Sequence, residues 1–256
     1  MILAAVVLFG LAWGSFANVL IARVPGGEDW VREPSHCPRC GHAIAWHDNV
    51  PVLSWLWLGR RCRHCRTRIS GRYPVVEILV AGLFVVVYGV FGLTFLALAM
   101  AYLALISVVL AAIDLDVYRL PDAIVLPAYP AIAVMLTADA ALAGEWWPLV
   151  RGTIGAFALA GFYFVMLVIN PKGMGLGDVK TAGVLGLALA YLGWAQLGVG
   201  AFFGPMIGGL FVIVALIRGR VTRKSRVPYG PALIAGAWVG VFGGSALFGA
   251  YVRLFT

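Results

Sequence analysis

Long apolar runs separated by short polar segments make up most of the chain. A helix that crosses a bilayer needs about 20 mostly apolar residues, and eight runs reach or approach this length. They lie at residues 1–22, 74–92, 93–113, 123–140, 149–169, 179–193, 195–217 and 231–254. The pattern predicts an all-α polytopic membrane protein with about eight transmembrane helices. The limits of the sixth run stay open, because it is short and rich in Gly and Ala.

One polar segment, residues 23–73, is long enough to form a small domain of its own. We therefore expect three parts: a first transmembrane helix at 1–22, a cytoplasmic domain at 23–73 and a seven-helix membrane domain at 74–256. The first run carries no Lys or Arg before it, unlike a signal peptide, so we expect a retained helix. Its small and polar residues Gly14, Ser15 and Asn18 should face other helices. For Asn18 an interhelical hydrogen bond is the ordinary role and a catalytic role the alternative.

The composition excludes an ordinary soluble protein, since 62% of the residues are hydrophobic and only 12% are charged. The net charge is +8. Seventeen of the 19 Lys and Arg residues lie in or beside the segments 23–73, 114–122, 170–178 and 218–230. Positive residues mark the cytoplasmic side of a membrane protein. The distribution therefore predicts that both chain ends lie outside and that these four segments face the cytoplasm. It also accounts for the charge without a nucleic-acid partner.

Four cysteines in the polar segment form two CxxC pairs, Cys37 with Cys40 and Cys62 with Cys65, 21 residues apart. Two such pairs are typical of one tetrahedral zinc site. Disulfides fit poorly in the reducing cytosol, and no thioredoxin-like pattern supports a redox pair. We expect one structural Zn²⁺ per chain, because four cysteines close the coordination sphere and 50 residues bury little core. All four histidines also lie in this segment, where solvated or outer positions are their ordinary roles: His36, His42, His47 and His64.

The candidate chemistry is acidic. The sequence has no GxSxG, HExxH or P-loop motif. Asp114, Asp116 and Asp122 follow the third apolar run, and Asp178 opens the sixth. Carboxylates at membrane depth are costly and are usually functional. Two that meet across helices can share a proton, so that one activates water and the other protonates a carbonyl.

Three glycines precede Asp178 at alternate positions: Gly173, Gly175 and Gly177. A strip without side chains lets another backbone approach, as a protease substrate must; the alternative is a turn with tight helix packing. Two of the acids also have ordinary interpretations. Asp122 follows a proline at a helix start and would be an N-cap, and Asp116 would be a solvated loop residue.

At these residues the chain resembles the bacterial prepilin peptidases, or type IV leader peptidases, which are GxGD-type aspartyl membrane proteases. The resemblance covers nearly the whole chain. It is carried by segments 14–18, 35–40, 46–54, 72–77, 114–122, 173–180 and 228–231.

The resemblance implies a dual activity at the cytoplasmic face of the bacterial inner membrane. Such enzymes remove the leader of type IV prepilins and type II secretion pseudopilins, then N-methylate the new terminal residue with S-adenosylmethionine. Mapped onto this chain, the protease aspartates are Asp114 and Asp178. Because all four cysteines are present, both activities are expected. No Rossmann-type signature is visible, so the methyl-donor site is assigned to no residues; the oligomeric state is likewise left open.

Two other classes of protein remain as alternatives. One is a transporter that uses a carboxylate pair, and the other is a membrane adaptor built on a zinc ribbon. For the protease, the helix ends predict a division of labour between the acids. Asp114 closes one helix, where free carbonyls disfavour a carboxylate, and Asp178 opens another, where free N–H groups favour one. We expect Asp178 to be the base and Asp114 the acid.

Overall fold

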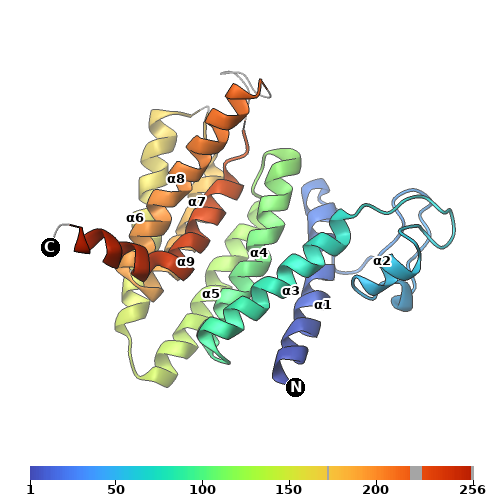
Figure 1. Cartoon of the computed structure of the whole chain (residues 1–256), viewed down its shortest axis with the longest axis horizontal. Helices are drawn as coiled ribbons and strands as arrows, with labels where there is room; N and C mark the ends of the chain where they lie inside the picture. Colours follow the sequence, from blue (N-terminus) through green and yellow to red (C-terminus); the bar gives the residue numbers. More distant parts are fainter. Residues whose placement is uncertain (172, 220–226, 255–256) are drawn as a thin grey trace. The chain divides into compact units, whose positions relative to one another are not determined.

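The computed structural model describes residues 1–171, 173–219 and 227–254 and is mainly helical, apart from the polar segment around α2, which is mostly loop (Figure 1). In these ranges β-type pairing is limited to two isolated bridges, and no strand is formed. The elements, in chain order, are α1 Ile2–Arg23, η1 Val24–Gly26, η2 Trp46–Asp48, α2 Leu53–Trp57, α3 Arg72–Phe91, α4 Phe95–Val117, α5 Asp122–Ala143, α6 Trp147–Ile169, α7 Leu176–Leu192, α8 Trp194–Ile217 and α9 Gly230–Arg253. The all-α prediction is confirmed.

Each of the eight apolar runs corresponds to one long helix, and seven of these helices are long and apolar enough to cross a membrane. The exception is α7, with 17 residues. It corresponds to the sixth run, whose limits the sequence left open. Two parts of the expected cytoplasmic segments, Lys172 and residues 220–226, lie outside the described residues.

The chain forms two compact units, Met1–Val109 and Leu110–Thr256. The first unit contains α1, the polar segment and α3, and α3 packs along α1. A Cβ added to Gly14 would lie 2.5 Å from the Cα of Glu77, so only glycine allows this approach. Nearby, the Asn18 amide donates to the carbonyl oxygen of Tyr73 at 3.1 Å. This is the interhelical hydrogen bond that we considered the ordinary role of Asn18.

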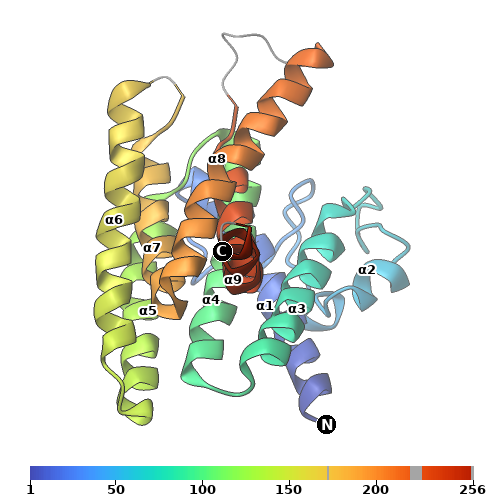
Figure 2. The ribbon, with the colours of Figure 1, turned by 60° about the vertical axis from the view of Figure 1, so that its left-hand side comes forward.

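The second unit is built around α7, which packs against α5, α6, α8 and α9. Figure 2 shows α6 running alongside α7. Small residues form that seam: a Cβ added to Gly155 would meet the Ala190 side chain and lie 2.8 Å from the Gly186 carbonyl oxygen. Twelve of the 17 residues of α7 are buried. At the C-terminal end of α7, the carbonyls of Ala190 and Tyr191 accept hydrogen bonds from the Arg151 side chain of α6. Neighbouring helices therefore cover α7, which explains how so short a helix is accommodated.

Candidate active site and metal centre

Asp178 lies in the first turn of α7 and is 8% exposed. Helix α7 begins after Gly175, in extended backbone, and the Asp178 carboxylate reaches back to accept the Gly175 N–H at 2.8 Å. A carboxylate at this position satisfies one of the N–H groups that a helix start leaves unpaired, and the helix dipole favours its charge. The GxGD segment therefore holds the acid at the end of a buried helix.

Asp114 lies in the last turn of α4 and is 5% exposed. Its carboxylate accepts the backbone N–H of Gly230, the first residue of α9, at 2.9 Å. A Cβ on Gly230 would lie 2.8 Å from the same carboxylate oxygen, so this contact requires glycine. The signal was present in the sequence as the Pro-Tyr-Gly-Pro segment 228–231, whose residues had no predicted role.

The second unit brings the two acids together, close enough to interact electrostatically. Leu120, in the connection from α4 to α5, lies against both of the glycines beside them: its Cβ would be 3.0 Å from a Cβ on Gly177, and its Cδ2 3.1 Å from one on Gly230. Each carboxylate accepts one backbone N–H. The helix ends alone would favour a charged Asp178 and a neutral Asp114. The N–H that Asp114 accepts also favours its charged form, so the difference between the two acids becomes smaller.

Two tyrosines complete this region, and sequence reasoning missed both. Tyr163 of α6 is fully buried, and its hydroxyl lies 3.4 Å from that of Tyr229. Both hydroxyls are within electrostatic range of Asp178. Tyr229 also precedes the glycine that donates to Asp114. The sequence around Tyr163 does not indicate that its hydroxyl lies near the acids, because its partner Tyr229 is 66 residues away in the chain.

Asp122 and two of the three glycines before Asp178 make contacts with side chains of the protein. Asp122 is the first residue of α5 and makes no N-cap; instead the Lys180 ammonium lies 2.8 Å from each of its carboxylate oxygens. That part of the sequence interpretation was wrong because the partner comes from another helix. Of the glycine strip, Gly177 is approached by Leu120 and Gly173 by Asn170, whereas Gly175 has its nearest contact, Asp178, at 3.7 Å.

The four cysteines of the first unit converge. Their sulfur atoms all lie within 4.8 Å of one another, and those of Cys37 and Cys65 are 3.8 Å apart. Four thiolates at about 2.3 Å from a tetrahedral Zn²⁺ would be spaced in this way. Backbone N–H groups of Cys40 and Arg39 lower the pKa of the Cys37 thiol to about 7, whereas burial and the neighbouring thiols raise the pKa of Cys40 to about 11. The spacing of the four sulfur atoms fits a metal that binds soft ligands.

The two knuckles have the same backbone. In the first, the N–H of Cys37 donates to the His42 carbonyl and that of Ile44 to the Ser35 carbonyl. In the second, the N–H of Cys62 donates to the Thr67 carbonyl and that of Ile69 to the Arg60 carbonyl. The residue four positions after the first cysteine has a positive φ in both: 68° at Gly41 and 55° at Arg66. Glycine adopts this conformation without strain and arginine does not. The knuckles are thus two copies of one turn around one cluster.

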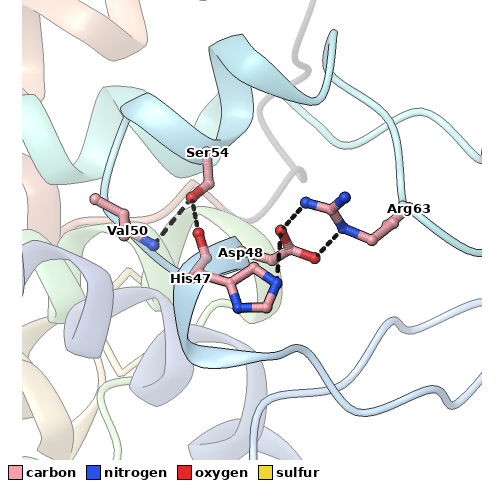
Figure 3. Close-up of polar contacts among 5 residues, drawn as sticks. All are labelled: His47, Asp48, Val50, Ser54 and Arg63. Atoms are coloured by element: carbon pink, nitrogen blue, oxygen red, sulfur yellow. Dashed lines mark hydrogen bonds and ion pairs between the residues drawn. The ribbon is translucent and has the colours of Figure 1, made fainter.

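An ion pair braces the segment between the knuckles. The Arg63 guanidinium makes two hydrogen bonds to the Asp48 carboxylate, one of them at 2.7 Å, and His47 lies beside the same carboxylate (Figure 3). These hydrogen bonds lower the pKa of Asp48. The pair therefore connects η2 to the second knuckle.

Together these features define a class: a helical, multi-pass membrane protein with a buried carboxylate pair and a cluster of four cysteines that could hold a metal ion. Comparison with known proteins is consistent with it. Residues 8–91 match the family model of the bacterial peptidase A24 N-terminal domain, and residues 101–217 match the type IV leader peptidase family. No solved structure matches.

The curated relatives are similar over most of the chain. A prepilin leader peptidase/N-methyltransferase of Aeromonas salmonicida is 33% identical over 94% of this chain and 91% of its own length. A protein of the same name from Pseudomonas putida is 34% identical over 96% of this chain and 92% of its own length. Another from Myxococcus xanthus is 40% identical over 83% of this chain and 63% of its own length. The chain belongs to the type IV leader peptidase family.

Proposed function

We propose that this chain is a membrane aspartyl endopeptidase that removes the leader of type IV prepilins and type II secretion pseudopilins and then N-methylates the new terminal residue. The observation that carries the proposal is the pairing of Asp114 with Asp178. Both acids are buried, each accepts a backbone N–H, and the second unit places them within electrostatic range. Family membership and the names of the relatives support the choice of substrate.

The geometry suits acid–base hydrolysis of a peptide bond. Two coupled carboxylates share one proton, because both cannot be ionised at close range. Asp178, at a helix start, takes a proton from the attacking water, and Asp114 donates its proton to the scissile carbonyl oxygen. The backbone N–H groups of Gly175 and Gly230 keep the two carboxylates in place.

The substrate approaches along the glycine strip. Gly175 is the member of the strip that offers the most space beside Asp178, with no atom closer than 3.7 Å to a Cβ built there. An extended leader peptide needs such a surface on which its backbone can lie. Gly173 and Gly177 flank this open position and allow the close packing of Asn170 and Leu120 beside it.

The zinc knuckles give the polar segment its fold. Cys37, Cys40, Cys62 and Cys65 would hold one Zn²⁺, which closes the coordination sphere and leaves no position for a substrate. The metal is therefore structural. S-adenosylmethionine is the methyl donor, in keeping with the N-methyltransferase name of the relatives.

The charge distribution supports the location. Arginines are concentrated in the polar segment of the first unit, so this segment faces the cytoplasm of an inner membrane and both chain ends lie outside. In this orientation the last turn of α4 and the first turn of α7 also lie at the cytoplasmic face, where a leader that precedes the prepilin's apolar helix is accessible.

The test is cleavage of a purified prepilin in detergent or nanodiscs, with and without S-adenosylmethionine. We expect a product shortened by the leader, and a further mass increase of one methyl group only when the donor is present. Asp178→Asn should give neither product, whereas Asp122→Asn, a carboxylate on the same side but outside the pair, should still cleave. An unshortened prepilin with the folded wild-type protein would reject the proposal.

A further inference from the structure

The segment between the two knuckles leaves the metal cluster and contacts a membrane helix. The backbone N–H of Val52, just before α2, donates to the Glu77 carboxylate of α3 at 2.7 Å. Glu77 is 7% exposed and lies five residues after the start of α3 at Arg72. With a rise of 1.5 Å per residue, this is about 7 Å along the helix. Val52 therefore lies beside the start of the membrane span and not beyond its end.

The backbone N–H groups of this segment have partners within the protein. The N–H of Val50 donates to the Ser54 hydroxyl, which donates to the His47 carbonyl (Figure 3). The N–H groups of Leu53 and Ser54 donate to the carbonyls of Pro51 and Val50. Proline has no N–H, and Val52 is paired with Glu77. Each backbone N–H from residue 50 to residue 54 is accounted for, so the segment exposes no unpaired donor to an apolar surrounding.

The turn at Val52 is held in a costly conformation. Its φ is 62° and its ψ −49°, with the Leu53 N–H to Pro51 carbonyl contact at 2.6 Å. This is a γ-turn with positive φ, which is rare and strained for a β-branched residue. Such a conformation persists only where the surroundings impose it. Here the buried carboxylate of Glu77 does so, which accounts for an acid that the acid–base mechanism does not use.

The turn directs apolar side chains outward. Leu53, Leu56 and Trp57 are 62%, 57% and 90% exposed. In contrast Ser54 is buried, and the Trp55 indole N–H donates to the Ile69 carbonyl. On α3, at the same level, the apolar residues Val75 and Ile78 are also exposed, as expected of a surface that faces lipid. Exposed apolar side chains therefore occur on α2 and on the first turns of α3, which the Val52–Glu77 hydrogen bond joins.

Basic residues follow the apolar ones. Arg60 lies over the Trp55 ring at 4.7 Å, and four more arginines come before the start of α3: Arg61, Arg63, Arg66 and Arg68. Leucine and tryptophan beside arginine are typical of segments that lie in the interface of a bilayer, with the apolar side chains among the acyl chains and the cations at the headgroups.

We propose that residues 50–57 are an interfacial membrane segment, with Leu53, Leu56 and Trp57 inserted among phospholipid acyl chains at the end of the bilayer where α3 begins. Of the arginines that follow, those other than Arg63, which is paired with Asp48, contact anionic headgroups. Glu77 secures the segment by accepting the Val52 N–H at that depth. This inference does not depend on the proteolytic activity.

The test places the photoreactive residue p-benzoylphenylalanine at Leu56 or Trp57 in the full chain, reconstituted in nanodiscs that contain phosphatidylglycerol. A matched control carries it at Arg39, an exposed position in the first knuckle. After illumination, mass spectrometry should find lipid adducts at positions 56 and 57 at least fivefold above those at 39. Zinc content verifies that each variant is folded. Lipid adducts no higher than the control, or adducts with a second copy of the chain, would overturn the proposal.

A second measurement tests the role of Glu77. Glu77→Gln keeps an oxygen that can accept the Val52 N–H, whereas Glu77→Leu removes it. With the photoreactive residue at position 57, the Gln variant should keep its lipid adducts and the Leu variant should lose at least half of them. Equal adduct yields in the two variants would show that Glu77 does not secure the segment.

Discussion

The two units of this protein position their functional residues in opposite ways. In the first unit the candidate metal ligands lie close together in sequence, and each knuckle forms its hydrogen bonds within ten residues. In the second unit the candidate acids lie 64 positions apart in sequence, and the donor to Asp114 comes from 116 residues away. The first site is therefore built by local turns, and the second by the packing of helices.

The largest effect should come from removal of the metal, because the polar segment has little core without it. Apparent binding energies of structural zinc are about 10–16 kcal/mol in small domains. In the Cys37→Ser/Cys62→Ser variant we expect zinc to fall from one ion per chain to none and trypsin to cut readily within residues 60–68. Helices of the second unit should stay intact, since their backbone hydrogen bonds are internal. Protection equal to that of the wild type would contradict the comparison.

The second unit should lose stability when a larger side chain is introduced where α6 packs against α7. In Gly155→Val the new side chain would meet Ala190 and the Gly186 carbonyl of α7. Overpacking of this kind costs about 3 kcal/mol, so the thermal midpoint in detergent should fall and cleavage with it. Gly161→Val is the control on the same helix, because a Cβ there meets nothing within 4 Å. Zinc content should not change in either variant, and equal midpoints would argue against the seam.

The duplicated knuckle allows a stabilising substitution. Arg66 has a positive φ where the first knuckle has Gly41. Arg66→Gly should relieve strain of about 1 kcal/mol, and Gly41→Ala should introduce a similar amount. Competition with a chelator measures both: 1 kcal/mol corresponds to about a fivefold change in apparent zinc affinity. A loss of affinity in Arg66→Gly would show that the arginine side chain matters more than its backbone.

The smallest effect concerns pH. The Arg63 guanidinium lowers the pKa of Asp48 in the folded segment. The pair therefore contributes stability above the pKa of an unfolded aspartate, about 3.9, and this contribution is lost as the pH falls through the lower, folded value. The wild type should be more protease-resistant than Asp48→Asn at pH 7, with the difference shrinking below about pH 4. Zinc release affects both proteins alike, so a difference that grows on acidification would contradict this.

Sequence reasoning found the features whose signal is local. Apolar runs identify the helices because the bilayer demands length, and CxxC spacing identifies the cysteine cluster because each turn directs two sulfurs to one point. The sequence indicated Asp178 as a candidate because GxGD is contiguous. In each of these cases the information lies within a few residues.

The missed features depend on partners that are distant in the chain. The N–H of Gly230, the tyrosine pair and the Glu77–Val52 hydrogen bond each join elements that only the fold brings together. Asp122 shows the same limit, because its position beside a proline indicated a cap and the folded helices supplied Lys180. Sequence patterns describe only the neighbours of a residue along the chain. The partners that such residues have in the folded protein come from other helices.

The central claim is that Asp114 and Asp178 act as one acid–base unit. It is tested most directly by the prepilin cleavage rates of Asp114→Asn, Asp178→Asn and the double variant, with zinc content and helicity as controls for folding. Residues that act as a unit are not additive. We expect all three variants to fall to the same residual rate, at least 1,000-fold below the wild type, about 4 kcal/mol of transition-state stabilisation. A folded single variant that keeps more than a tenth of the wild-type rate would contradict the claim.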